Sequence, residues 1–180
     1  MLVTSALLSM FRAATTIDGV PHDRREALRR KYLSLGVGEL VAAAVFAVVL
    51  PRLTSAENAA AMWCALVPLL VILVQASVYW LAARRWVHSR PMPARIAAVY
   101  RGFRAFNVAL LAAGLIGILV WMPSTIGAAL LVLAVWAFGV VEYVNYFVVR
   151  LSYPVGSWLS RIGQWRTPRL VQDIQSSEPR

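Results

Sequence analysis

Two glutamates lie inside long apolar segments, where a carboxylate can bind a polar group or relay protons. Glu39 belongs to the apolar run 32–50, and Glu142 to the run 126–148. A charged side chain at the centre of a membrane helix costs about 2.5–3.5 kcal/mol on insertion scales. Each glutamate therefore needs a proton, a hydrogen-bond donor, an opposite charge or water. The group that meets Glu142 is the central question that this sequence raises.

Further polar side chains are expected at nearly the same depth. Glu39, Gln75 and Glu142 each lie eight or nine residues from a basic residue at the end of their segment. Equal spacing from one membrane face predicts one layer, because a helix rises about 1.5 Å per residue. The predicted polar layer comprises Glu39, Gln75, Tyr79, Asn107, Glu142, Asn145 and Tyr146. The basic residues expected at its cytoplasmic mouth or on lipid head groups are Arg84, Arg85, Arg101, Arg104 and Arg150.

Two interpretations of this layer remain open. In one, it lines a cavity that faces the cytoplasm and binds a polar group or relays protons. In the other, it is a hydrogen-bond network that fixes the packing of four helices. Two carboxylates in one dry layer do not both stay ionised cheaply. We therefore expect that one is protonated or that Arg104 reaches up to form an ion pair.

The elements that position these residues are helices. The chain is 60% hydrophobic and 14% charged, whereas soluble domains are about 25% charged. Its hydrophobic pattern predicts an all-α membrane protein with a short C-terminal interfacial helix that contains Trp158 and Trp165. The four predicted transmembrane helices are 32–50, 60–81, 106–122 and 126–148.

Three regions follow from this pattern: a cytoplasmic N-terminal arm (1–31), a four-helix transmembrane domain (32–153) and a cytoplasmic interfacial helix with a polar tail (154–180). Within the arm, the stretch 23–31 is predicted to be helical. The third helix is expected to start near Ala94, outside the lipid core.

Small residues predict where helices approach one another, and one proline predicts a kink. Pro68 is expected to kink the second helix and to leave the Cys64 carbonyl without its helical donor. Gly114 and Gly117 are expected to form a close-packing face on the third helix, and Gly36 lies in a similar small-residue stretch on the first.

The distribution of basic residues predicts the orientation. Of 18 lysines and arginines, only Arg52 falls in a loop on the side opposite the termini. Cytoplasmic loops carry an excess of lysine and arginine. We therefore predict a multi-pass protein of the bacterial cytoplasmic (inner) membrane with both termini in the cytoplasm. The net charge of +10 fits contact with anionic lipid head groups, and nucleic acid is not an expected partner.

The residues do not predict a cofactor, a metal site or a catalytic centre. The chain has one cysteine, Cys64, so an intrachain disulfide is excluded. His22 and His88 lie in separate loops without carboxylates at ligand spacing. No serine has a histidine in a plausible partnership, and there is no glycine-rich phosphate loop. An enzyme is therefore not the favoured interpretation.

The run 142–147 (Glu-Tyr-Val-Asn-Tyr-Phe), followed by 150–153 (Arg-Leu-Ser-Tyr), resembles a motif of small uncharacterised bacterial four-span membrane proteins. Those proteins are similar in a Glu-Tyr-(Ile/Val)-Asn-Tyr element on the last span and a basic cytoplasmic tail. The corresponding tail residues here are Arg166, Pro168, Arg169, Leu170, Asp173 and Ile174. The resemblance implies no activity. Small multidrug exporters also have four spans and a glutamate in the first, which is an analogy only.

Three functions follow from these alternatives. The first is a structural or accessory subunit that interacts with a membrane-protein partner or with copies of itself. The second is a homo-oligomeric, proton-linked transporter or pore that uses Glu39 and Glu142, since one chain of four spans can hardly enclose a path. The third is a membrane enzyme that modifies a lipid, with Glu142 as general base.

Overall fold

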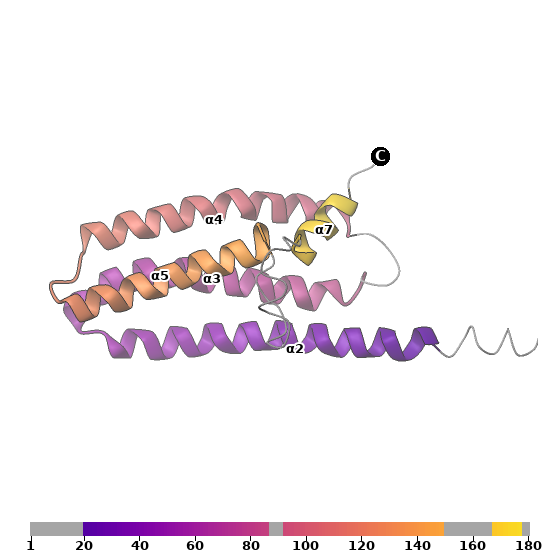
Figure 1. Cartoon of the computed structure of the whole chain (residues 1–180), viewed down its shortest axis with the longest axis horizontal. Helices are drawn as coiled ribbons and strands as arrows, with labels where there is room; N and C mark the ends of the chain where they lie inside the picture. The colour runs from indigo at the N-terminus through magenta and orange to yellow at the C-terminus, as the bar shows by residue number, and fades with distance from the viewer. Residues whose placement is uncertain (1–19, 87–91, 150–166, 178–180) are drawn as a thin grey trace, which may run out of the picture.

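The structure is a computed structural model that describes residues 20–86, 92–149 and 167–177. The described part confirms the predicted fold class: it contains four helices that are long and apolar enough to cross a membrane. These helices are α2 (Val20–Val49), α3 (Ala59–Ala83), α4 (Ala94–Val120) and α5 (Ile126–Phe147). They run side by side along the long axis of the molecule (Figure 1).

The helix bounds follow the sequence signals closely. The stretch 23–31 is helical as predicted, and it continues without a break into the first apolar span, so that α2 has 30 residues. α4 begins at Ala94, directly after Pro93, as predicted. Thr125 precedes α5, and its hydroxyl accepts a hydrogen bond from the Ala128 backbone N–H at 3.4 Å. This contact is a helix N-cap.

The short connections place neighbouring helices antiparallel. Two 3-10 helices, η1 (Leu50–Leu53) and η2 (Ala56–Asn58), link α2 to α3. The turn 121–125 links α4 to α5. The end of α2 that carries Lys31 therefore lies at the same end of the molecule as the last turns of α3 and α5 and the start of α4 (Figure 1). We call this the α7 end, after the short C-terminal helix α7 (Arg169–Ser176) that lies there.

α3 is the central helix. α2, α4 and α5 each pack against it, and α3 is the most buried of the four. One cluster of buried side chains around Tyr79 and Tyr100 fills the α7 end, and a second around Leu66 and Val132 fills the opposite end. The outer faces of the helices are apolar and exposed, for example at Val120 (67%) and Leu130 (63%), as expected of surfaces that contact lipid.

Glycines allow two of the helix contacts. A Cβ on Gly36 would lie 2.8 Å from the Leu81 side chain, and the Ser77 hydroxyl donates to the Gly36 carbonyl at 2.7 Å. A Cβ on Gly114 would lie 2.5 Å from the Cys64 carbonyl oxygen. Cys64 is four residues before Pro68, so this carbonyl is the one that proline deprives of its helical donor. The predicted close-packing face on α4 therefore contacts α3 at the Cys64 carbonyl, which lacks a helical donor because of Pro68.

The C-terminal tail differs from its prediction. Residues 167–180 were expected to be a polar tail, but the structure has a helix there, α7 (Arg169–Ser176), which packs against α4 and α5. The reason is Leu170 and Asp173, which are 2% and 7% exposed and share one face of α7. The interfacial helix predicted around Trp158 and Trp165, and residues 1–19 of the predicted N-terminal arm, lie outside the described residues.

Candidate functional site

The predicted polar layer divides into three groups of contacts. Gln75 and Asn107 lie between α3 and α4, Tyr79 lies under α7, and Glu39, Glu142, Asn145 and Tyr146 lie around a cavity between α2 and α5. The first two groups are closed by protein atoms. The third is open to a cavity.

The closed group between α3 and α4 is a reciprocal amide pair. The Gln75 amide nitrogen donates to Asn107 Oδ1 at 3.2 Å, and the Asn107 amide nitrogen donates to Gln75 Oε1 at 2.7 Å. The Tyr100 hydroxyl donates to the Gln75 backbone carbonyl at 3.0 Å. Asn107 is fully buried and Gln75 is 8% exposed. Each amide thus satisfies the other inside the bundle, as the structural interpretation of the layer expects.

Asp173 on α7 forms the contact that sequence reasoning missed. Its Oδ2 accepts hydrogen bonds from the Tyr79 hydroxyl at 2.9 Å and from Trp86 Nε1 at 3.4 Å. Its Oδ1 lies 3.2 Å from Arg169 Nε, one turn away on α7. A buried carboxylate needs such donors. The signal in the sequence was an acidic residue in a basic tail, at a spacing of three from Leu170.

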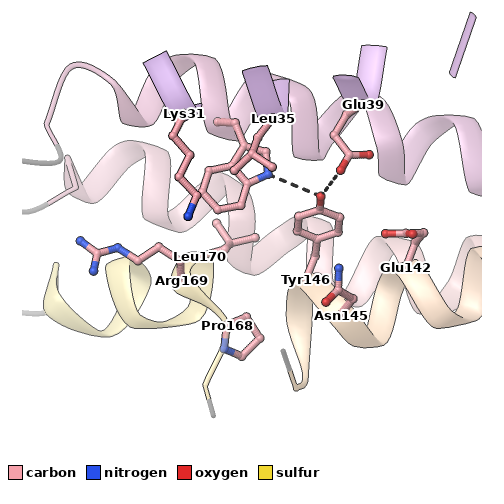
Figure 2. A pocket seen from close by; sticks show the side chains of 10 residues that line it. Lys31, Leu35, Glu39, Glu142, Asn145, Tyr146, Pro168, Arg169 and Leu170 are labelled. Atoms are coloured by element: carbon pink, nitrogen blue, oxygen red, sulfur yellow. Dashed lines mark hydrogen bonds between the residues drawn. The ribbon is translucent and has the colours of Figure 1, made fainter. Parts of the chain in front are cut away.

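The cavity between α2 and α5 has a volume of about 210 Å³. One face of α2, the end of α5, the start of α7 and Trp80 of α3 form its walls. Its polar and charged lining residues are Lys31, Glu39, Glu142, Asn145, Tyr146 and Arg169. Figure 2 shows Lys31, Leu35 and Glu39 pointing from α2 into the cavity. The three share a face because they are four residues apart.

A chain of hydrogen bonds crosses the cavity from α3 to α2. Trp80 Nε1 donates to the Tyr146 oxygen at 3.4 Å. The Tyr146 hydroxyl in turn donates to Glu39 Oε1 (Figure 2). Tyr146 is 7% exposed, so α5 supplies a buried donor to a carboxylate of α2. Glu39 itself is half-buried.

Glu142 is the second carboxylate of the cavity. Asn145, on the same face of α5, hydrogen-bonds to it. Glu142 is close enough to Glu39 for their charges to interact. Two ionised carboxylates repel each other, and a bound cation or a shared proton removes that repulsion. The arrangement is therefore chemically suited to proton exchange or to binding a cationic group.

The ion pair expected between Arg104 and a glutamate is wrong for the described part of the chain. Arg104 is exposed, and its backbone carbonyl accepts a hydrogen bond from the Tyr143 hydroxyl at 3.4 Å. Arg30 instead pairs with Glu26, and Arg169 pairs with Asp173. The physical reason is that Tyr146 already reaches Glu39 from a neighbouring helix, whereas Arg104 points to the outside.

Of the other predicted mouth residues, Arg84, Arg85 and Arg101 lie at the α7 end but do not line the cavity. Arg85 and Arg101 are exposed. Arg84 is half-buried, and its Nε is enclosed by protein atoms. Arg150 lies outside the described residues. The cations at the cavity are instead Lys31 and Arg169, which the predicted site did not include.

These features define a class: a small all-α protein with the architecture of a multi-pass membrane protein and a carboxylate-lined cavity at one end. Comparisons with family models, with curated proteins and with solved structures found no match to this chain. Within the described ranges, no three histidine, cysteine, aspartate or glutamate side chains gather as metal ligands.

Proposed function

We propose that this chain is a small multi-pass membrane protein that binds a cationic group in the cavity between α2 and α5. The observation that carries the proposal is that Glu39 and Glu142, from different helices, line the same cavity beside Trp80 and Tyr146. Carboxylates attract a cation by charge, and aromatic faces add cation–π attraction. A cation and a proton compete for the same carboxylates, so the site suits a proton-linked transporter.

The proposed orientation places the mouth of the cavity at the cytoplasm. It is supported by the basic residues at the α7 end, which the positive-inside rule assigns to the cytoplasmic side of a bacterial inner membrane. Lys31 and Arg85 are examples, and both are exposed. In this orientation a ligand enters from the cytoplasm, beside anionic lipid head groups.

The test is calorimetric titration of the full chain in nanodiscs with hexylamine, a monovalent cation with a short apolar tail. We expect the double variant Glu39→Gln/Glu142→Gln to bind it at least tenfold more weakly than the wild type, because both negative charges are lost. The matched control is Glu57→Gln, since Glu57 is exposed in η2 at the opposite end of the molecule. Equal binding by the wild type and the double variant would refute the proposal.

The second candidate function is the structural or accessory subunit. It is favoured by the outer face of α2, where Gly38 is exposed and a Cβ added to it would meet no atom within 4 Å. A helix of a partner or of a second copy can approach closely at such a position. Light scattering of the detergent-solubilised protein tests self-association, and Gly38→Leu should lower the mass of any oligomer formed through this face.

A further inference from the structure

The cavity carries opposite charges at its two ends. Glu39 and Glu142 lie at the inner end, and Lys31 and Arg169 lie toward α7 (Figure 2). Lys31 and Glu39 are eight residues apart on α2, which corresponds to about 12 Å along the helix axis. The lining therefore has a polarity: negative deep in the bundle and positive at the end that α7 covers.

We propose that the ligand of this cavity is a small zwitterion, with an ammonium group at the two glutamates and a carboxylate at Lys31 and Arg169. This inference rests on the proposed function, because it assumes that a cation binds at Glu39 and Glu142. It adds the chemical class of the ligand. It also assigns a role to the basic side chains Lys31 and Arg169, which the binding of a simple cation does not explain.

Charge balance favours a zwitterion over a simple cation. Two glutamates face two basic residues around one cavity. A ligand with only a positive charge has to move past Lys31 and Arg169 to reach the glutamates, and it remains near these two side chains when bound. Like charges repel one another in such a partly dry site. A zwitterion has the opposite polarity to the lining, so both of its ends meet a complementary charge.

The α7 helix fixes one of these cations. Arg169 Nε pairs with Asp173, while the side chain remains 43% exposed. A guanidinium has five N–H donors, so the pair with Asp173 leaves donors for a ligand carboxylate. Asp173 is itself held by Tyr79 and Trp86 of the bundle. Asp173 is thus a positioning residue that holds Arg169 at the cavity.

The experiment compares 6-aminohexanoate with 6-aminohexanamide, which has the same length but an uncharged end. Binding is measured by calorimetric titration of the full chain in nanodiscs, with hexylamine as the reference cation. We expect the wild type to bind the acid about fivefold more tightly than the amide, as partly exposed charge pairs allow. The preference should disappear in Lys31→Gln/Arg169→Gln and shrink in Lys31→Gln, which leaves α7 intact.

The control variant is Arg30→Gln/Arg85→Gln, which removes two exposed cations at the α7 end that do not line the cavity. This control variant should keep the preference for the acid, because neither Arg30 nor Arg85 lines the cavity. If the preference came from net charge alone, both double variants would lower it. Equal binding of acid and amide by the wild type, with hexylamine still bound, would overturn the zwitterion and leave the proposed function standing. Failure of all three compounds to bind would refute the proposed function and the zwitterion together.

Discussion

The amide pair between α3 and α4 and the carboxylates between α2 and α5 are both polar groups inside apolar helices, but they solve the problem of burial differently. Gln75 and Asn107 each have a donor and an acceptor, so they satisfy one another at 2.7 and 3.2 Å. Ionised Glu39 and Glu142 have acceptors only. They depend on Tyr146 and Asn145 for donors, and a cavity remains beside them.

This contrast teaches that donor and acceptor balance separates a structural polar group from a binding site. A pair that is complete within the chain has nothing left to offer a ligand. A pair of acceptors is incomplete, because neither carboxylate can donate to the other unless it is protonated. The missing partner is a proton or a cation, and the cavity has room for one.

The largest effect is expected where the closed pair is broken. Asn107→Leu leaves the Gln75 amide buried without its partner, and we expect the free energy of unfolding in bicelles to fall by about 3 kcal/mol. Steric trapping measures this change. Gln75→Leu/Asn107→Leu removes both amides and should recover most of the loss. A double variant as unstable as the single one would show that the amide pair is not self-contained.

The next largest effect is expected at the contact of α4 with the proline region of α3. Gly114→Ala places a Cβ 2.5 Å from a backbone oxygen, so the helices have to separate, at a cost of about 2 kcal/mol. Gly38→Ala is the control, because a Cβ there meets nothing within 4 Å. Equal free energies of unfolding for Gly114→Ala and Gly38→Ala would contradict a close contact of Gly114 with the Cys64 carbonyl.

Docking of α7 provides a smaller, local effect. Asp173→Ala removes the acceptor for the Tyr79 hydroxyl and for Trp86 Nε1, and we expect it to weaken α7 docking by about 1.5 kcal/mol. Hydrogen–deuterium exchange of residues 169–176 should rise by about tenfold, since 1.4 kcal/mol corresponds to a factor of ten. Unchanged exchange in α7, with the bundle helices as internal reference, would refute the role of Asp173.

Much of the fold was predictable from the sequence, and the reasons are physical. Apolar length predicts the four helices, because about 20 apolar residues are needed to cross a bilayer, and all four are present in the described part of the chain. Gly114 was predicted to lie on a close-packing face of the third helix, and the structure places that position against Cys64 and Pro68 of α3. The sequence did not predict that α3 is the neighbour.

The partners of the polar residues were not predictable to the same degree. Depth does not decide which helix face meets which neighbour, so Asn107 and Glu142 were placed in one layer although they belong to different groups. Asp173 and Tyr79 are separated by 94 residues. Local sequence periodicity does not indicate which residues so far apart in the chain come into contact. Likewise, Arg104 was expected to pair with a glutamate from its predicted depth alone.

The smallest destabilisation is expected within the cavity. Tyr146→Phe removes the donor to Glu39 and the acceptor for Trp80 Nε1. Because water can enter the cavity and replace these contacts, we expect a loss of about 1 kcal/mol in the free energy of unfolding. Tyr143→Phe is the matched control, as its hydroxyl contacts the Arg104 backbone on an exposed surface. If Tyr146→Phe lowered the free energy of unfolding as much as Asn107→Leu does, water could not be replacing the lost contacts, and the cavity would be closed to solvent.

The unfolding free energy of Glu39→Gln/Glu142→Gln, measured in bicelles against the wild type, tests the division between closed and open polar groups most directly. Glutamine keeps an oxygen for the Tyr146 hydroxyl and removes the repulsion between two carboxylates. We predict a stability within about 0.5 kcal/mol of the wild type, or above it, as for substitutions that leave packing intact. A loss of about 3 kcal/mol, like that of Asn107→Leu, would show instead that the carboxylates hold the fold together.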